Sequence, residues 1–254
     1  MLTAAYLCAC SVATRPTEPV HVILIGDSTM ARVTGYGDAL CARFNAATKC
    51  DNLARGGRSS KSYRGEGLWD AALARIEDPG YRTFVLIQFG HNDQPGKAER
   101  STTLPEFRAN MQRYLDDIRA AGAIGVLVTP LARRSFRDNV LLDDLGPWAE
   151  ATIEVASASK TPLLDLHRDS MQAIATMGAV DALSLAELPP PDHALAAAST
   201  GTTVSVDKPI APGPNVHMPA FDYTHLGPKG AELFSAIVAG EIRESVPELG
   251  DSLR

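Results

Sequence analysis

The sequence predicts an α/β protein built as a three-layer α/β/α sandwich, and two observations lead to this prediction. Short runs of β-branched and aliphatic residues alternate with longer segments whose apolar residues recur at helical spacing. The length of 254 residues and the hydrophobic content of 45% suit one large α/β domain or two small ones. Alternation of this kind implies parallel strands joined by right-handed helical crossovers.

Five segments have the composition of buried strands, and helical segments separate them. The first strand ends at Gly26, and Gly122 suits the end of the helix before the fourth strand. Pro228 suits the first turn of the last helix. The expected strands, all short and rich in aliphatic or aromatic residues, are residues 20–25, 50–53, 84–89, 124–129 and 162–166. The expected helices, all with apolar residues at helical spacing, are residues 31–44, 68–76, 104–121, 148–157, 170–177 and 228–242.

Residues 178–220 break this alternation. They are rich in Pro, Ala, Ser and Thr, and they show little amphipathic periodicity. A loop of this length inside a compact domain is usually functional or disordered. We interpret it as a mobile wall or lid over a site within a single domain at residues 19–254, and an insertion without a role is the alternative.

The first 18 residues stand apart from this domain. Residues 1–13 are small and apolar, similar to the end of a secretory signal, although the basic start of such a signal is missing. Residues 7–10, Leu-Cys-Ala-Cys, are similar to a bacterial lipoprotein cleavage site. We therefore expect a secreted, periplasmic or envelope-anchored protein, and the frayed terminus of a cytoplasmic protein is the alternative.

Cysteine usage and charge exclude several classes of protein. Cys41 and Cys50 form either a short-loop disulfide, which implies an oxidising compartment, or two buried free thiols. No CxxC pair or Cys/His cluster has zinc spacing. The net charge of −6 argues against a nucleic-acid partner, and no apolar run approaches the roughly 20 residues that cross a bilayer. We expect a soluble monomer without metal or cofactor.

Ser28 follows the first expected strand directly, in the segment Gly26-Asp27-Ser28-Thr29-Met30. A serine at the carboxyl end of a strand stands in the crevice where open α/β sheets bind ligands. This position makes Ser28 a candidate nucleophile. A helix N-cap, which is compatible with catalysis, is the structural alternative.

Asp222 and His225, in the segment Asp222-Tyr223-Thr224-His225 before the last expected helix, supply further groups for acyl transfer. A serine needs a base to take its proton, and histidine, with an ordinary pKa near 6.5, suits this role. A carboxylate three residues earlier can fix the imidazole tautomer and stabilise the imidazolium. A metal site made by His217, Asp222 and His225 is the alternative, but it would leave the serine without a role.

Two more segments follow expected strands and suit an oxyanion hole. Asn92, in Phe89-Gly90-His91-Asn92-Asp93, follows the third strand and can donate its side-chain amide to a developing oxyanion. Gly57, which follows the second strand, lets a backbone N–H approach the same oxygen, and Gly56 is the competing candidate. The Ser28 N–H makes three donors.

In this order the four segments resemble the SGNH hydrolases, also called GDSL-type esterases, which take Ser, Gly, Asn and His from separate blocks. The blocks here read IGDSTM, NLARGGRSS, IQFGHND and DYTHLGPKG. The rhamnogalacturonan acetylesterase branch is more similar still, because it favours GDST, GRS, FGHND and D-x-T-H. The resemblance covers roughly residues 20–242.

The resemblance implies a flavodoxin-like fold with five parallel strands in the order 2-1-3-4-5. It implies Ser28 as nucleophile, His225 as general base and acid, and Asp222 as the group that orients His225. Gly57, favoured over its neighbour, and Asn92 would join the Ser28 N–H in the oxyanion hole. The implied reaction removes acetyl groups from a carbohydrate, such as a pectic rhamnogalacturonan-type polysaccharide or its fragments, without a cofactor.

Arg55, Arg58, Lys61 and Arg64 place four cations within ten residues beside the expected oxyanion glycine. We interpret some of them as ligands for the carboxylates of an acidic polysaccharide, because local positive potential attracts an anionic substrate. A solvated loop is the alternative. His91 is a further candidate for orienting substrate, although a hydrogen-bonded structural histidine is favoured.

Two other functions remain as alternatives. The same triad in a lipase or thioesterase would act on longer acyl chains, and a decayed esterase would only bind carbohydrate. Asp27 and Asp93 are interpreted as structural groups that fix their turns. Trp69 and Trp148 are interpreted as core residues rather than platforms for sugar rings.

Overall fold

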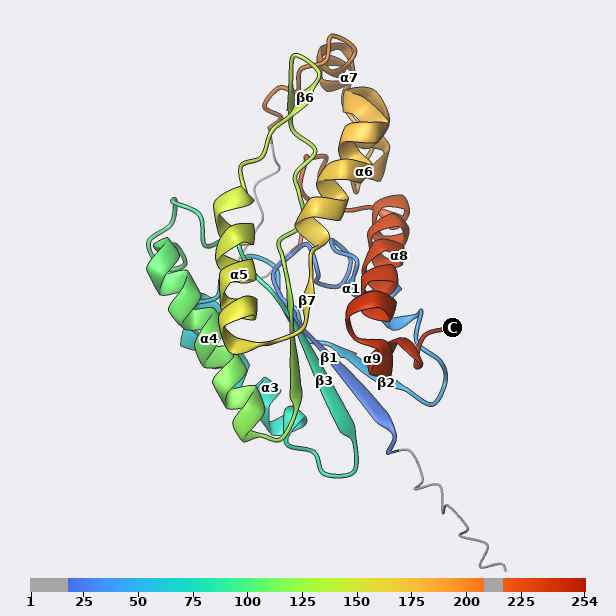
Figure 1. Cartoon of the computed structure of the whole chain (residues 1–254). Helices are drawn as coiled ribbons and strands as arrows, with labels where there is room; N and C mark the ends of the chain where they lie inside the picture. Colours follow the sequence, from blue (N-terminus) through green and yellow to red (C-terminus); the bar gives the residue numbers. More distant parts are fainter. Residues whose placement is uncertain (1–17, 208–216) are drawn as a thin grey trace, which may run out of the picture.

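The computed structural model describes residues 18–207 and 217–254. Almost all of the predicted leader, with its lipoprotein-like residues, and residues 208–216 of the predicted insertion lie outside the described residues. The described chain forms an α/β/α sandwich around a five-stranded parallel sheet with the order β2-β1-β3-β4-β7 (Figure 1). Because β7 is the fifth strand of this sheet along the chain, the predicted fold class and strand order are confirmed.

The first strand along the chain is β1 (Val20–Gly26), an interior strand of the sheet that is buried from its second residue onward. It pairs in parallel with β2 (Lys49–Asn52) on one side and β3 (Arg82–Gln88) on the other. β4 (Ile124–Val128) and β7 (Leu163–Leu164) complete the sheet. Since all strands are parallel, their carboxyl ends meet at one edge. The segments predicted to carry the site therefore leave the sheet side by side.

Helices cover both faces of the sheet, and alternate strand residues point to opposite faces. Ile23 and Leu24 of β1 accordingly belong to two different hydrophobic cores. The Ile23 core includes Trp69 and Trp148, as predicted. The helices that contribute to this core are α3 (Leu68–Ile76), α4 (Leu104–Ala120) and α5 (Gly146–Ser159). The helices that contribute to the Leu24 core are α1 (Gly37–Cys41), α6 (Leu166–Asp181) and α8 (Pro228–Ser245).

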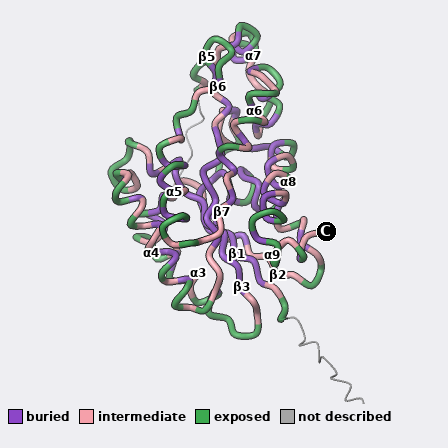
Figure 2. The backbone as a smooth tube through the Cα atoms, in the orientation of Figure 1, coloured by how far each residue is buried: buried purple, intermediate pink, exposed green. Residues whose placement is uncertain are grey.

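Two short helices are additional to those predicted, α2 (Ser62–Gly65) and α9 (Pro247–Gly250). Figure 2 shows the sheet as the most continuous stretch of buried backbone, with exposed residues on the outer sides of the helices. Within the described ranges, no helix combines the length and the apolar character that a membrane span requires.

The predicted helix at residues 31–44 is mostly wrong, because only α1 forms there. The preceding residues fold back onto the segment after β1, where the Tyr36 N–H donates to the Thr29 carbonyl (3.0 Å). Gly35 makes this close return feasible, since a Cβ at that position would lie 2.3 Å from the Thr29 oxygen. Close backbone packing thus replaces the first turns of the expected helix.

The predicted boundary between the last strand and the next helix is also wrong. The strand predicted at residues 162–166 shortens to β7, and the helix predicted at residues 170–177 extends to become α6. Asp165 ends the strand because its side chain caps α6 by accepting a hydrogen bond from the Arg168 N–H (3.4 Å).

The part of residues 178–220 predicted to lack regular structure contains helices where it is described, and the prediction is wrong for these segments. α6 continues past a kink at Gly178 and is followed by η1 (Ala182–Leu185) and α7 (Asp192–Ala198). A hairpin that the sequence did not predict, β5 (Phe136–Arg137) and β6 (Val140–Leu141), bonds to this segment, because the Asn139 N–H donates to the Gly201 carbonyl (2.9 Å). Together they project beyond the edge of the sheet at which the strands end (Figure 1).

Cys41 and Cys50 form a disulfide that joins the end of α1 to β2. Of the two interpretations left open by the sequence, the structure therefore contains the bridge rather than the free thiols. The bond closes a loop with a sequence separation of 9 residues.

Replacing both Cys41 and Cys50 by serine is expected to lower the free energy of unfolding by roughly 2–3 kcal/mol, because the bridge restricts the unfolded chain. Urea denaturation measures this difference. A reductant should lower the stability of the wild type to the same value and leave the double variant unchanged. Equal stability of the two oxidised proteins would contradict the bridge.

Candidate active site

Ser28 is brought to the carboxyl edge of the sheet by a turn that follows β1. The carboxylate of Asp27 fixes this turn, because its Oδ1 accepts hydrogen bonds from the N–H (2.9 Å) and the Oγ1 (2.8 Å) of Thr29. Gly26 is required before it, since a Cβ there would lie 2.7 Å from the Gln88 carbonyl oxygen of the neighbouring strand. Ser28 is 9% exposed and borders a cleft.

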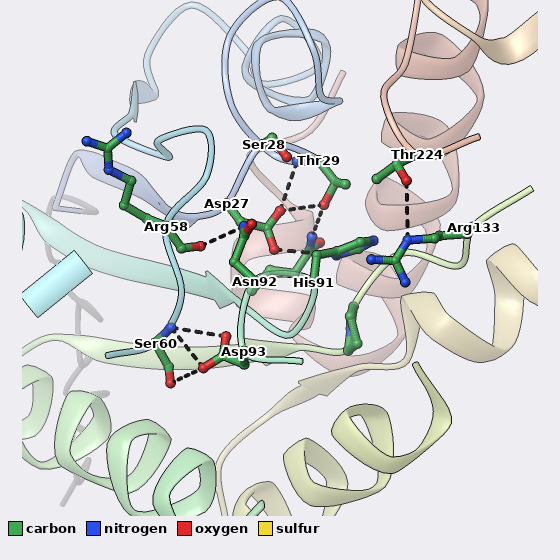
Figure 3. A network of polar contacts seen from close by, with 12 residues as sticks. Asp27, Ser28, Thr29, Arg58, Ser60, His91, Asn92, Asp93, Arg133 and Thr224 are labelled. Carbon is green, nitrogen blue, oxygen red and sulfur yellow. Dashed lines mark hydrogen bonds and ion pairs between the residues drawn. The ribbon is translucent and has the colours of Figure 1, made fainter. Parts of the chain in front are cut away.

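A chain of buried side chains holds this turn in place. Figure 3 shows its last members, Thr29 and Asp27, with His91 beside Asp27. Tyr36 Oη donates to Gln88 Oε1 (2.6 Å), and Gln88 Nε2 donates to Thr29 Oγ1 (2.6 Å), which donates in turn to Asp27. Asp27 Oδ2 lies 3.4 Å from His91 Nδ1. Burial acts to raise the pKa of Asp27, but His91 and the hydrogen bonds from Thr29 outweigh it, so that this pKa lies below its ordinary value.

His91 contacts Asp27 and is not among the residues that line the cleft. Of the two interpretations given to His91, this placement favours the structural one. The 3.4 Å approach lacks hydrogen-bond geometry, so the histidine is a close neighbour of Asp27 rather than the hydrogen-bonded histidine that was expected.

Asp222 and His225 form a close pair in the loop before α8. His225 Nδ1 lies 2.6 Å from Asp222 Oδ2, while Asp222 Oδ1 accepts hydrogen bonds from the N–H groups of His225 (2.7 Å) and Thr224 (2.8 Å). Asp222 is only 5% exposed. A carboxylate that accepts the Nδ1 proton leaves Nε2 as the basic nitrogen of the imidazole. The pair therefore has the geometry of an oriented general base.

Ser28 and His225 border the same cleft, whose volume is about 1120 Å³. Thr34 links their loops, because its Oγ1 donates to the Ser28 carbonyl (2.8 Å) and its carbonyl accepts from the Leu226 N–H (2.9 Å). Within the described part of the chain no hydrogen bond joins Ser28 Oγ to His225 Nε2. Such bonds are often long before substrate binds. The fold thus brings the two predicted groups to one site.

The predicted oxyanion glycine lies in a tight turn from Arg55 to Arg58. The Arg58 N–H donates to the Arg55 carbonyl (3.3 Å), and Gly57 has a φ of +78°, which favours glycine. The Gly56 carbonyl accepts a hydrogen bond from Arg58 Nη1 (2.8 Å). Because this peptide bond is trans, the Gly57 N–H points the opposite way.

Both glycines of this turn line the cleft, and a Cβ on Gly56 would lie 3.7 Å from the Ser28 Cβ. Asn92 is held against the same turn, since its Nδ2 donates to the Arg58 carbonyl (3.0 Å; Figure 3). That bond uses one amide hydrogen and leaves the other available. Among the described residues, the N–H groups of Ser28 and Gly57 donate to no acceptor. The free N–H groups of Ser28 and Gly57 thus belong to residues that line the cleft, whereas Asn92 is not among the lining residues and reaches the turn through its bond to Arg58.

Asp93 fixes the loop that carries Asn92. Its buried carboxylate accepts hydrogen bonds from the Ser60 N–H (3.1 Å), Ser60 Oγ (2.5 Å) and Thr102 Oγ1 (3.1 Å). Burial raises the pKa of Asp93 to about 6, and the hydrogen bonds from Ser60 and Thr102 oppose this rise. These contacts fit the structural role predicted for Asp93.

The four cations predicted to meet substrate separate into two pairs. Arg55 and Arg58 line the cleft. Arg64 and Lys61 do not, because Arg64 Nη2 donates to Asp117 (2.6 Å) and Lys61 Nζ donates to a main-chain carbonyl (3.1 Å). The candidate set therefore narrows to Arg55 and Arg58.

Other cations of the cleft were not predicted from the sequence. One of them, Arg100, bonds the turn from Arg55 to Arg58. Arg100 Nη1 donates to the Gly57 carbonyl (3.2 Å). Lys97 and Arg100 follow Asn92 in the segment after β3. The strand order therefore predicts that they lie at the same edge of the sheet as Asn92. The cationic side chains that line the cleft are Arg32, Arg55, Arg58, Arg75, Lys97 and Arg100. The acidic ones are Asp51, Glu66 and Glu99.

His217, considered above as a metal ligand, also lines the cleft, where its Nε2 lies 2.5 Å from Glu187 Oε1. In residues 18–207 and 217–254, no group of three or more His, Cys, Asp or Glu side chains is arranged to hold a metal ion. His225 is instead committed to Asp222.

Comparison with known proteins identifies the family. Residues 24–233 match the model of the GDSL-like Lipase/Acylhydrolase family, which is most of the chain. The chain belongs to this family. The GDSL family consists of carboxylic ester hydrolases, so membership confirms both the resemblance seen in the sequence and the prediction of an enzyme.

Similar members of the GDSL family come from Bacillus subtilis. The chain is 28% identical over 241 residues to the probable rhamnogalacturonan acetylesterase YesY, covering 92% of this chain and 97% of that protein. It is 32% identical over 157 residues to the rhamnogalacturonan acetylesterase RhgT, covering 59% and 66%.

Solved structures of GDSL-like proteins share the fold. The B. subtilis protein YxiM has a TM-score of 0.67 at 21% identity, with 91% of this chain and 58% of that chain covered. The acetylxylan esterase Axe2 from Geobacillus stearothermophilus has a TM-score of 0.59 at 16% identity, with 89% and 95% covered. At 21% and 16% identity, these similarities show a shared fold.

Replacing Asn92 by alanine is expected to lower kcat for p-nitrophenyl acetate by about 100- to 1000-fold, because the amide donates to charge that exists only in the transition state. The KM should stay within about two-fold. Steady-state kinetics measure both values. Gln94→Ala, in the same loop but bonded to the Asp144 carbonyl, is the control that should keep wild-type activity. Full activity of Asn92→Ala would exclude this role.

Proposed function

We propose that the chain is a serine esterase that removes acetyl groups from a carbohydrate through an acetyl-enzyme. The observation that carries this proposal is the close Asp222–His225 pair, because His225 lines the same cleft as Ser28 and as Gly57 with its free N–H. The family and the relatives named as rhamnogalacturonan acetylesterases support the acetylated carbohydrate as substrate.

In the proposed reaction Ser28 Oγ attacks the acetyl carbonyl carbon while its proton passes to His225 Nε2. The electron pair of the carbonyl moves to oxygen, where the N–H groups of Ser28 and Gly57 and the amide of Asn92 stabilise it. When the tetrahedral intermediate collapses, the sugar oxygen leaves with the proton from His225. A water molecule, deprotonated by His225, then attacks acetyl-Ser28 and releases acetate.

We propose an acidic, pectic polysaccharide or its fragments as the substrate. Arg55, Lys97 and Arg100 line the cleft, and within the described part of the chain they form no salt bridge. A cation without a carboxylate partner is available to a substrate carboxylate, and its local potential acts despite the net charge of −6. The cleft volume suits several sugar units of a polymer.

A polymeric substrate lies outside the cell, and we propose that the enzyme is exported. The Cys41–Cys50 disulfide supports this location, because such bonds persist in oxidising compartments.

Replacing Ser28 by alanine is expected to lower kcat for p-nitrophenyl acetate by about 10⁴- to 10⁶-fold without changing the circular dichroism spectrum, since the nucleophile is lost. In the wild type, activity should fall steeply for p-nitrophenyl esters with chains beyond about four carbons. Retention of most activity by the variant would refute the serine mechanism. A preference for long chains would instead support the lipase or thioesterase alternative.

Replacing Arg55 and Lys97 together by glutamine is expected to lower kcat/KM for acetylated rhamnogalacturonan fragments about ten-fold relative to that for p-nitrophenyl acetate. Two attractive contacts to substrate carboxylates are lost, each with a modest free energy at a solvated site. Added salt should lower wild-type activity on the charged fragments more than on the neutral ester. Arg137→Gln, on the exposed hairpin, is the matched control. An unchanged ratio would argue against an acidic substrate.

A further inference from the structure

Arg134, in the segment after β4, makes hydrogen bonds to the whole of the loop that carries the proposed base. Its Nη2 donates to the carbonyls of Asp222 (2.9 Å) and His225 (2.7 Å), and its Nη1 donates to the carbonyl of Thr224 (3.3 Å). Its own N–H donates to the carbonyl of Tyr223 (2.9 Å). One residue thus provides a donor for each main-chain carbonyl from residue 222 to residue 225.

These bonds constrain the loop in addition to those of the Asp222 carboxylate. That carboxylate accepts the N–H groups of Thr224 and His225, so the loop is bonded through both its N–H groups and its carbonyls. A guanidinium is a planar, rigid fork, so it fixes the relative orientation of the peptide groups that it bonds. The direction of the His225 side chain depends on these peptide groups.

The burial of the Arg134 guanidinium contributes little net stability to the fold. Its side chain is 0% exposed, and its Nε is buried without a hydrogen-bond acceptor in the described part of the chain. Burial lowers its pKa to about 10, and the Asp222 carboxylate opposes this shift, so the group is charged at neutral pH. Buried charges are often no more stabilising than apolar residues of the same size. Its contacts therefore point to a geometric role.

We propose that Arg134 is the positioning residue of the catalytic base, and that its guanidinium holds the Asp222–His225 loop in the orientation that directs His225 towards Ser28. Arg134 is buried beneath the loop and outside the cleft lining, so it acts through His225. The inference rests on the proposed function. Misplacement of a catalytic group by about 1 Å is enough to reduce the rate about 100-fold.

The test compares Arg134→Met and Arg134→Lys with Arg43→Met. Arg43 is the matched control, because it also donates to several groups of another element, Ser235 Oγ and the carbonyl and carboxylate of Glu232, but is not among the residues that line the cleft. For p-nitrophenyl acetate, Arg134→Met should lower kcat about 100-fold with KM within two-fold. Arg134→Lys should recover part of the loss, because one ammonium group cannot reach every carbonyl. Arg43→Met should lower the melting temperature and leave kcat unchanged.

A spectroscopic measurement reports the base directly. The proton shared by His225 Nδ1 and Asp222 should give a low-field ¹H NMR signal in the wild type and in Arg43→Met, and this signal should shift or broaden in Arg134→Met. If Arg134→Met does not fold, the kcat and the signal of Arg134→Lys decide the question.

Wild-type kcat and an unchanged low-field signal in a folded Arg134 variant would overturn the positioning role. So would a loss of kcat in Arg43→Met as large as that in Arg134→Met. In both cases the serine mechanism stands as long as Ser28→Ala is inactive. If instead Ser28→Ala retains activity, the proposed function fails first.

Discussion

The parallel pairing of β1 with β2 and β3 is the constraint on which the site depends. Leu24 of β1 pairs with Asn52, and Gly26 pairs with Gln88, so that the three strands end side by side. The residues of β1 and β3 supply both hydrophobic cores, and Cys50 of β2 packs against one of them. Packing energy therefore places three loops that are distant in sequence at one edge, and the loops need only local adjustments to face one another.

Three buried aspartates fix the loops of the site, including the loop before α8 that carries His225. Asp27 binds the N–H of Thr29, Asp93 binds that of Ser60, and Asp222 binds those of Thr224 and His225. Loops lack the regular hydrogen bonds of helices and strands, so a carboxylate that accepts main-chain N–H groups is an effective way to hold one conformation.

The charge of the cleft differs from that of the whole chain. Cations outnumber acids in its lining, although the chain carries a net charge of −6. Four of the cations come from two segments: Arg55 and Arg58 follow β2, and Lys97 and Arg100 follow β3. In general, positive potential next to a site favours anionic ligands and negative charge that develops on a ligand oxygen.

The sequence by itself determined the sandwich, the strand order and the identity of the polar groups at the strand ends. Strand periodicity is local and strong, and the four blocks have specific residues in a specific order. The parts it missed depend on contacts between distant segments. Residues 31–44 lose most of their predicted helix because Gly35 packs against the Thr29 backbone. The helix at residues 192–198 directly follows three consecutive prolines, which are typical of a loop, so it was not predicted.

Only the tertiary structure decided which charged groups serve the site. Arg55 and Arg64 look alike in sequence, yet one lines the cleft and the other bonds Asp117. No feature of the sequence distinguishes Arg134 from Arg133, because the carbonyls that Arg134 bonds lie about 90 residues further along the chain. The partner of a side chain from a distant part of the sequence depends on where the other strands end. A local sequence pattern does not encode the distance between such segments in the fold.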